Sequence, residues 1–193
     1  VPMHGRALDA WPDGSVRWML CELLVNATST SEPLAFLTTD APAAAFTPVR
    51  VETTAGGLRL DAGRLQLELA PGLPFPFGRV TSAQQPVLDA SGSGLTIDTD
   101  GTALRIDIAQ VEVRSSSAVR AEVLVRGVAR GGAGCPLEIE SRLECFAESA
   151  TVRVHTTLRN PRPAAHPGGC WVLGDPASVF VRAAECRLAM PGG

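Results

Sequence analysis

The chain has no lysine and no tyrosine, so all 17 of its basic side chains are arginines. Mechanisms that need a lysine amine or a tyrosine phenolate, such as Schiff-base formation, are therefore closed to this chain on its own. No apolar run approaches the roughly 20 residues that span a bilayer, so we expect no membrane span. The formal net charge is −3 and no dense basic stripe is present, which argues against nucleic acid as the main partner.

Metal-binding and redox spacings are missing as well. None of the five cysteines belongs to a C-x-x-C or C-x-x-H pair; they are Cys21, Cys135, Cys145, Cys170 and Cys186. We expect reduced thiols scattered through the core, no metal site and no cofactor. Export of the protein would allow one disulfide among the last four cysteines, and the sequence does not choose its pairing. A phosphate-binding glycine loop and a G-x-S-x-G nucleophile elbow are also lacking.

The remaining composition is that of a globular protein. Hydrophobic residues make up 45% of the 193 residues and charged residues 19%. The chain starts at Val1-Pro2-Met3-His4 with neither an initiator methionine nor a signal peptide, and it ends on Met190 to Gly193, which is typical of a turn. We therefore expect a segment of a longer protein.

The most informative motif is the octapeptide W-P-D-G-S-V-R-W, Trp11 to Trp18, which the largely apolar run Met19 to Val25 follows. Asp13-Gly14 between two apolar runs predicts a hairpin with a type I′ turn, because that turn needs positive φ at both central residues. Pro12 cannot donate to a strand ladder, so it suits the end of the incoming strand. We expect one tryptophan on each arm, packed across the strands rather than stacked on a ligand.

Strand patterns fill most of the rest of the chain. Arg64 to Leu69 alternates strictly between polar and apolar residues, and Asp100-Gly101 predicts a second tight hairpin turn. Long strands are expected over residues 103–113 (Leu104, Ile106, Ile108, Val111 and Val113 facing inward past a bulge near Gln110), 118–130, 137–146, 151–158 and 178–188. Helical periodicity is nearly absent. The sequence therefore predicts an all-β fold.

The Ser-, Thr-, Ala- and Pro-rich stretch from Thr28 to Thr47 is typical of a connection and marks a module boundary. Residues 48–193 are expected to form an antiparallel β-sandwich. Residues 1–47 are expected to be a partial N-terminal module, a fragment of a small β-barrel.

The octapeptide resembles the N-terminal barrel module of the exo-rhamnogalacturonan lyase-like family, in which a W-P-D-G-S-x-R-W stretch precedes a hydrophobic strand. The segment from Asn160 to Val179 resembles the long loop of the β-sandwich module that follows the barrel in that family. Both motifs occur in the same order. The resemblance implies a partial RIFT-type barrel and a sandwich at the front of a large polysaccharide-processing protein, with a helical toroid domain that supplies much of the substrate cleft.

Cleavage of a uronic-acid polymer by elimination needs a base for the C5 proton and a group that neutralises the adjacent carboxylate. The predicted substrate-binding residues lie in or beside the long loop, and they are Arg162, His166, Trp171 and Asp175. The alternative is a loop that is simply packed by its prolines and glycines. We expect His155 to face solvent from a strand and Arg17 to pair with Asp13 or Glu22. The catalytic residues remain unassigned.

These inferences predict a β-rich module, non-catalytic or partly catalytic, that binds or positions an acidic pectin-type polysaccharide for a helical partner domain. A secreted or periplasmic location follows from that function. The alternative is a free-standing β-sandwich subunit of a surface or extracellular assembly, in which exposed edge strands pair with further copies of the chain. Polymer binding that is lost on substitution of Trp171 or Arg162 favours the first hypothesis, and self-association without glycan favours the second.

Overall fold

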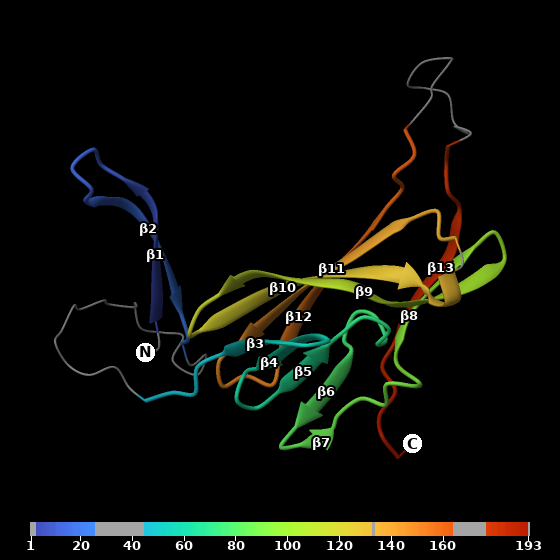
Figure 1. The fold of residues 1–193 in the computed structure, drawn as a ribbon, viewed down its shortest axis with the longest axis horizontal. Coiled ribbons are helices and arrows are strands. Elements are labelled where there is room, and N and C mark those ends of the chain that lie inside the picture. The colour runs from blue at the N-terminus through green and yellow to red at the C-terminus, as the bar shows by residue number, and fades with distance from the viewer. Residues whose placement is uncertain (1–2, 26–44, 133, 164–176, 193) are drawn as a thin grey trace, which may run out of the picture.

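The chain is built almost entirely from antiparallel β-strands. We describe it with a computed structural model, and the description covers residues 3–25, 45–132, 134–163 and 177–192. Within these residues, 13 strands form three antiparallel sheets and the one helical segment is a short 3₁₀ turn, Arg130–Gly132 (Figure 1). No helix in this described part of the chain has the length and apolar character to cross a membrane. The all-β prediction is confirmed.

Two of the three sheets face each other. The larger has the order β12-β11-β10-β9-β8-β13, with β8 Gly94–Thr99, β9 Thr102–Ser116, β10 Arg120–Ala129, β11 Glu138–Phe146, β12 Val152–Arg159 and β13 Val181–Arg187. The smaller has the order β3-β4-β5-β6-β7, with β3 Arg50–Thr54, β4 Gly57–Asp61, β5 Gln66–Leu69, β6 Arg79–Ser82 and β7 Gln85–Pro86. This arrangement confirms a two-sheet antiparallel fold.

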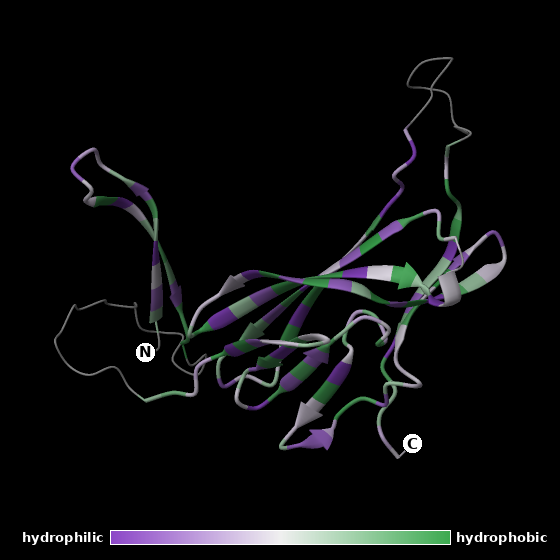
Figure 2. Ribbon diagram, in the orientation of Figure 1, coloured by the Kyte–Doolittle hydropathy of each residue, from purple (hydrophilic) through white to green (hydrophobic). Residues whose placement is uncertain are grey.

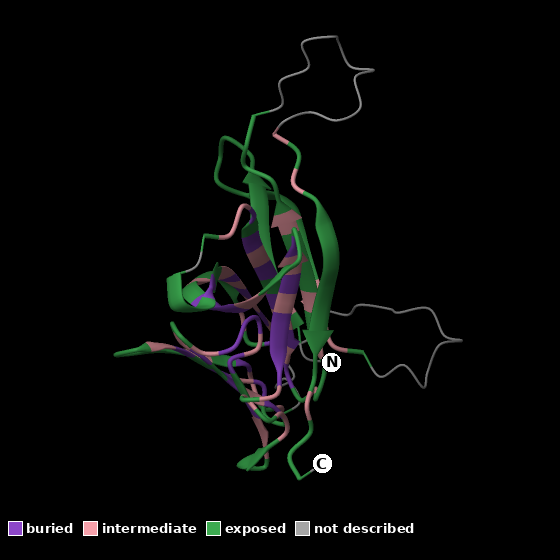
Figure 3. Ribbon diagram, turned by 90° about the vertical axis from the view of Figure 1, so that its right-hand side faces the viewer, coloured by how far each residue is buried: buried purple, intermediate pink, exposed green. Residues whose placement is uncertain are grey.

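The hydrophobic core lies between these two sheets. Alternate leucines of the smaller sheet are buried, as strict period-two alternation predicts, and Figure 2 shows this alternation along the strands. They join one cluster with Ile106 and Ile108 of β9 and with Val123 and Val125 of β10, while Phe75 fills the space between the sheets with no exposed surface. Figure 3 shows the buried residues concentrated where the two sheets overlap.

Strand β9 is longer than the smaller sheet that covers it, and it carries two bulges. Gly127 and Arg126 of β10 pair with Ile108 and Gln110, so Ala109 has no partner, which confirms the predicted bulge. A second bulge leaves Arg114 unpaired. Val113 was expected to face the core but is 39% exposed, because β9 continues there past the covering sheet.

The N-terminal hairpin is present, but its turn differs from the predicted one. The Gly14 N–H donates to the Trp11 carbonyl at 2.9 Å, and φ is positive at Gly14 (85°) but not at Asp13. This is the pattern of a type I turn followed by a glycine bulge. Pro12 favours that turn because its ring presets φ at the first central position. The predicted hairpin turn at Asp100-Gly101 is confirmed, and both residues have positive φ (54° and 83°), as a type I′ turn requires.

Strands β1 (Met3–Ala10) and β2 (Val16–Leu23) form a separate two-stranded ribbon. Trp11 and Trp18 are 50% and 62% exposed, so neither ring is buried in a core, and no described layer covers either face of the ribbon. Arg17 stacks over Trp11 at 4.7 Å and pairs with Asp9 at 3.3 Å instead of the predicted Asp13 or Glu22. The remainder of the 1–47 barrel module includes residues 26–44, which lie outside the described residues, so that module stays a prediction.

Candidate functional site

The predicted loop site lies mostly outside the described residues. His166, Trp171 and Asp175 fall in the range 164–176, so their arrangement is untested. Arg162 is exposed just after β12, and its backbone N–H donates to Asn160 Oδ1 at 3.0 Å. It lines a shallow depression of about 520 Å³ beside the β8–β9 turn, at the end of the larger sheet that lies away from the ribbon (Figure 1).

His155 faces solvent from β12, as expected, and pairs in register with Arg142 of β11.

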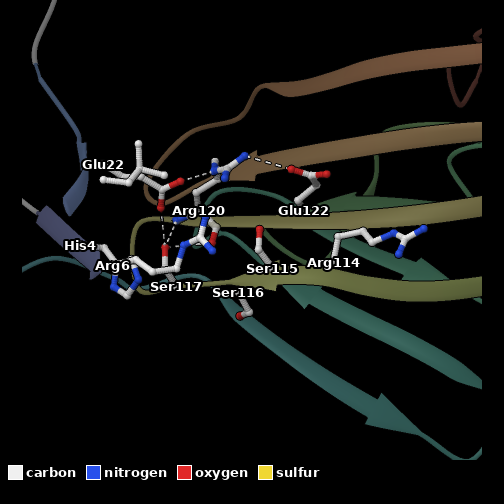
Figure 4. A pocket seen from close by; sticks show the side chains of 10 residues that line it. His4, Arg6, Glu22, Arg114, Ser115, Ser116, Ser117, Arg120 and Glu122 are labelled. Carbon is white, nitrogen blue, oxygen red and sulfur yellow. Dashed lines mark hydrogen bonds and ion pairs between the residues drawn. The ribbon is translucent and has the colours of Figure 1, made fainter. Parts of the chain in front are cut away.

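A different pocket lies where the β1–β2 ribbon meets the turn between β9 and β10. Its volume is about 480 Å³, and polar side chains from four strands surround it (Figure 4). Its lining residues are His4, Arg6, Leu20, Glu22, Arg114, Ser115, Ser116, Ser117, Arg120 and Glu122.

The strand register explains how these side chains converge. On the ribbon, His4 lies opposite Glu22 and Arg6 lies opposite Leu20, so all four project from one face. On the sandwich, the bulge at Arg114 takes that residue out of the regular alternation and turns its side chain toward the pocket. The chain then reverses tightly, with the Ser117 N–H donating to the Arg120 carbonyl at 2.8 Å.

Arg120 holds the ribbon to the sandwich. Its Nε donates to Glu22 Oε1 at 2.7 Å, and its Nη1 donates to Glu144 at 2.9 Å and to Glu122 at 3.2 Å (the Glu22 and Glu122 bonds are drawn in Figure 4). Ser117 Oγ donates to the other oxygen of Glu22 at 3.3 Å. Burial alone lowers the pKa of the Arg120 guanidinium, but the Glu22 hydrogen bond and the three carboxylate charges raise it above its ordinary value. Arg120 thus uses its Nε and Nη1 donors on three carboxylates, which makes its role structural.

The other cationic groups of the pocket are less occupied. The side chains of Arg6 and His4 make no hydrogen bond or ion pair with any described residue. Arg114 pairs with Glu112 at 2.9 Å, but 47% of its side chain is exposed. Arg120 already compensates the two carboxylates that line the pocket, Glu22 and Glu122. The positive charge of Arg6 is thus open to an anionic ligand, although the whole chain carries −3.

An exposed aromatic ring lies on the same ribbon face as the pocket residues. Trp18 lies on the same face of β2 as Leu20 and Glu22, because residues two apart in a strand share a face. Its ring is 62% exposed. Flat aromatic rings present an apolar face that suits the C–H face of a sugar, with a polar edge beside it. The free guanidinium of Arg6 in the pocket and the exposed ring of Trp18 therefore lie on the same face of the ribbon.

Sequence reasoning missed this pocket. The octapeptide correctly drew attention to the hairpin, but Arg6 and His4 lie before it in an otherwise generic strand. Arg114 reaches the pocket only through a bulge, which no residue pattern in that part of β9 marked.

Comparison with known protein families finds no matching family, and comparison with characterised proteins finds no significant sequence similarity.

Proposed function

We propose that this chain is a β-rich module of a polysaccharide-lyase-like protein, and that it binds or positions an acidic, pectin-type polysaccharide. The observation that carries the proposal is the free guanidinium of Arg6 in a pocket, with the exposed Trp18 on the same face of β2, two residues beyond the lining residue Leu20. The resemblance of Trp11 to Trp18 to the exo-rhamnogalacturonan lyase-like family supports the same substrate class. The role assigned to these residues is binding, not bond cleavage.

The chemistry of the pocket suits a uronate. A guanidinium binds a carboxylate through two parallel N–H···O bonds, which fix the orientation of the sugar as well as attract it. Ser115 and Ser116 add hydroxyls that donate to or accept from sugar hydroxyl groups, and Trp18 offers an apolar surface to the next ring. A neutral polysaccharide gains only the last two of these interactions.

The test is the affinity of the whole chain for polygalacturonate, with neutral galactan as the matched polymer, measured by isothermal titration calorimetry. Removal of the Arg6 guanidinium in Arg6→Ala should weaken polygalacturonate binding about tenfold, since a hydrogen bond to a charged group contributes about 1.5–3 kcal/mol. Arg50→Ala is the control, because Arg50 is an exposed arginine on the smaller sheet and lines none of these pockets. Equal binding of both polymers, or equal losses in both variants, contradicts the proposal.

The predicted loop residues form a separate part of the same proposal. Arg162 lies at the far end of the larger sheet, so its contribution is independent of the Arg6 pocket. Substitution of Arg162 or Trp171 should weaken polymer binding if the loop carries a second contact.

The alternative proposal is an assembly subunit, and the exposed ribbon favours it. A two-stranded ribbon alone is marginally stable in water, and large apolar side chains of this one are exposed. They are Met3, Leu8, Trp11, Val16, Trp18, Met19 and Leu20. Sedimentation velocity over a range of protein concentrations, with and without polygalacturonate, separates the two functions: glycan-independent dimers or larger species support assembly.

A further inference from the structure

A second depression lies on the outer face of the larger sheet and continues the first pocket. It has a volume of about 290 Å³ and crosses β10, β11 and β12. Arg114 and Glu122 line both hollows, so the two are joined along these side chains. At the far end stand Arg142 and His155.

The register places Leu124, Arg142 and His155 in one row across the strands. Leu124 of β10 lies opposite Arg142 of β11, and Arg142 lies opposite His155 of β12. In this row the β9 residue is Glu112, which lies opposite Leu124; Arg114 stands beside the row, at the bulge two residues further along β9, and pairs with Glu112 at 2.9 Å. Neighbouring strands are about 4.8 Å apart, so the path from β9 to His155 spans about 14 Å. This path runs across the sheet toward the edge strand β12. The whole path is longer than one sugar ring.

The far end of the row holds a second accessible cationic group. Arg142 is 50% exposed, and its ion pair with Glu122 is long, at 4.0 Å. The His155 side chain is exposed and has no hydrogen-bond or ion-pair partner among the described residues. Glu140, the nearby acid, is already compensated by Arg126 Nε at 2.8 Å. The donors of Arg142 are thus free to meet a carboxylate.

We infer that the pocket and the outer-face depression form one groove that binds an acidic polysaccharide across strands β9 to β12. One uronate lies against Arg6 and Arg114, and a later uronate of the same polymer chain lies against Arg142 and His155. This inference rests on the proposed function and deepens it, because it assigns the groove to a polymer and not to a single sugar or a chain end alone. A long ligand that binds the first cationic site can reach the second one without a further loss of translational and rotational freedom, so its affinity rises.

The experiment compares galacturonic acid oligomers of increasing length, from the monomer to the hexamer, by isothermal titration calorimetry with the whole chain. Affinity should rise by about tenfold once the oligomer is long enough to reach Arg142, since one further charge-assisted contact is gained. Arg142→Ala should remove this gain for long oligomers and leave short oligomers unaffected. Arg6→Ala should weaken both, and Arg50→Ala should weaken neither.

Arg142→Ala should not unfold the protein, because the long, half-exposed ion pair of Arg142 contributes little to stability. Circular dichroism with thermal unfolding verifies that each variant is folded. If short and long oligomers bind equally well, or if Arg142→Ala weakens both alike, the second subsite is refuted while the proposed function stands. If no oligomer binds and polygalacturonate does not bind either, the proposed function fails and the inference fails with it.

Discussion

Replacing Arg120 should be the most damaging single change to the charged residues of this chain. In Arg120→Met, three carboxylates (Glu22, Glu122 and Glu144) lose their shared cation while their side chains stay only 14–20% exposed. Each hydrogen bond to a charged group contributes about 1.5–3 kcal/mol, but three bonds to one side chain are not additive and partial exposure lowers each of them. Breaking a buried pair costs about 3–5 kcal/mol, so we expect a loss of about 3 kcal/mol here.

The assay is differential scanning calorimetry, with urea unfolding as a second measure. For a chain of this size, 3 kcal/mol corresponds to a fall in Tm of about 6–12 °C. Arg153→Ala is the matched control: it removes one bond to Glu144, but the arginine is 71% exposed, so its loss should stay below about 1 kcal/mol. A loss below about 1 kcal/mol for Arg120→Met as well would refute the view that this node stabilises the junction. A double-mutant cycle with Glu22→Gln then measures how much of the loss belongs to the ribbon contact.

Three further experiments, two substitutions and one chemical modification, test the core and its charged residues. Asp107→Asn should destabilise the protein by about 2 kcal/mol in urea unfolding, because the Asp107 carboxylate is 12% exposed and accepts two bonds from Arg130 at 2.7 and 2.8 Å; a loss near zero contradicts this. Burial raises the pKa of the Cys145 thiol to about 12, so iodoacetamide at pH 8 should modify it only after unfolding, as peptide mass mapping would reveal. Gly127→Ala should cost about 1–3 kcal/mol, since a Cβ there would lie 2.6 Å from Ile106 Cγ2; an unchanged Tm would mean that the core shifts to accept it.

Local patterns determined most of the fold. The alternating leucines of β4 and β5 and the Asp100-Gly101 turn follow directly from side-chain period and backbone preference, and the structure places them as predicted. The turn at Pro12 shows where such rules compete: a proline that presets one turn type outweighed the Asp-Gly pair that favours another.

The candidate site depended on information that no local pattern contains. Arg6, Arg114 and Arg142 are far apart in the chain, and nothing in the sequence around any of them marks it as a site residue. They line one groove because of which strands are neighbours, where a bulge interrupts the register, and how the ribbon approaches the β9–β10 turn. These are consequences of the whole fold, so the sequence predicted the sheet that carries the groove but not the groove itself.

The way in which the ribbon is joined to the sandwich has a consequence for how the two parts respond to their surroundings. The described hydrogen bonds between them all end on the Glu22 carboxylate, whereas apolar contacts hold the two large sheets together. Apolar burial weakens on cooling, while contacts between partly exposed charges weaken with added salt. Salt should therefore weaken the Glu22 contacts between the ribbon and the sandwich while the sandwich stays folded. Cooling should instead weaken the apolar packing between the two large sheets first.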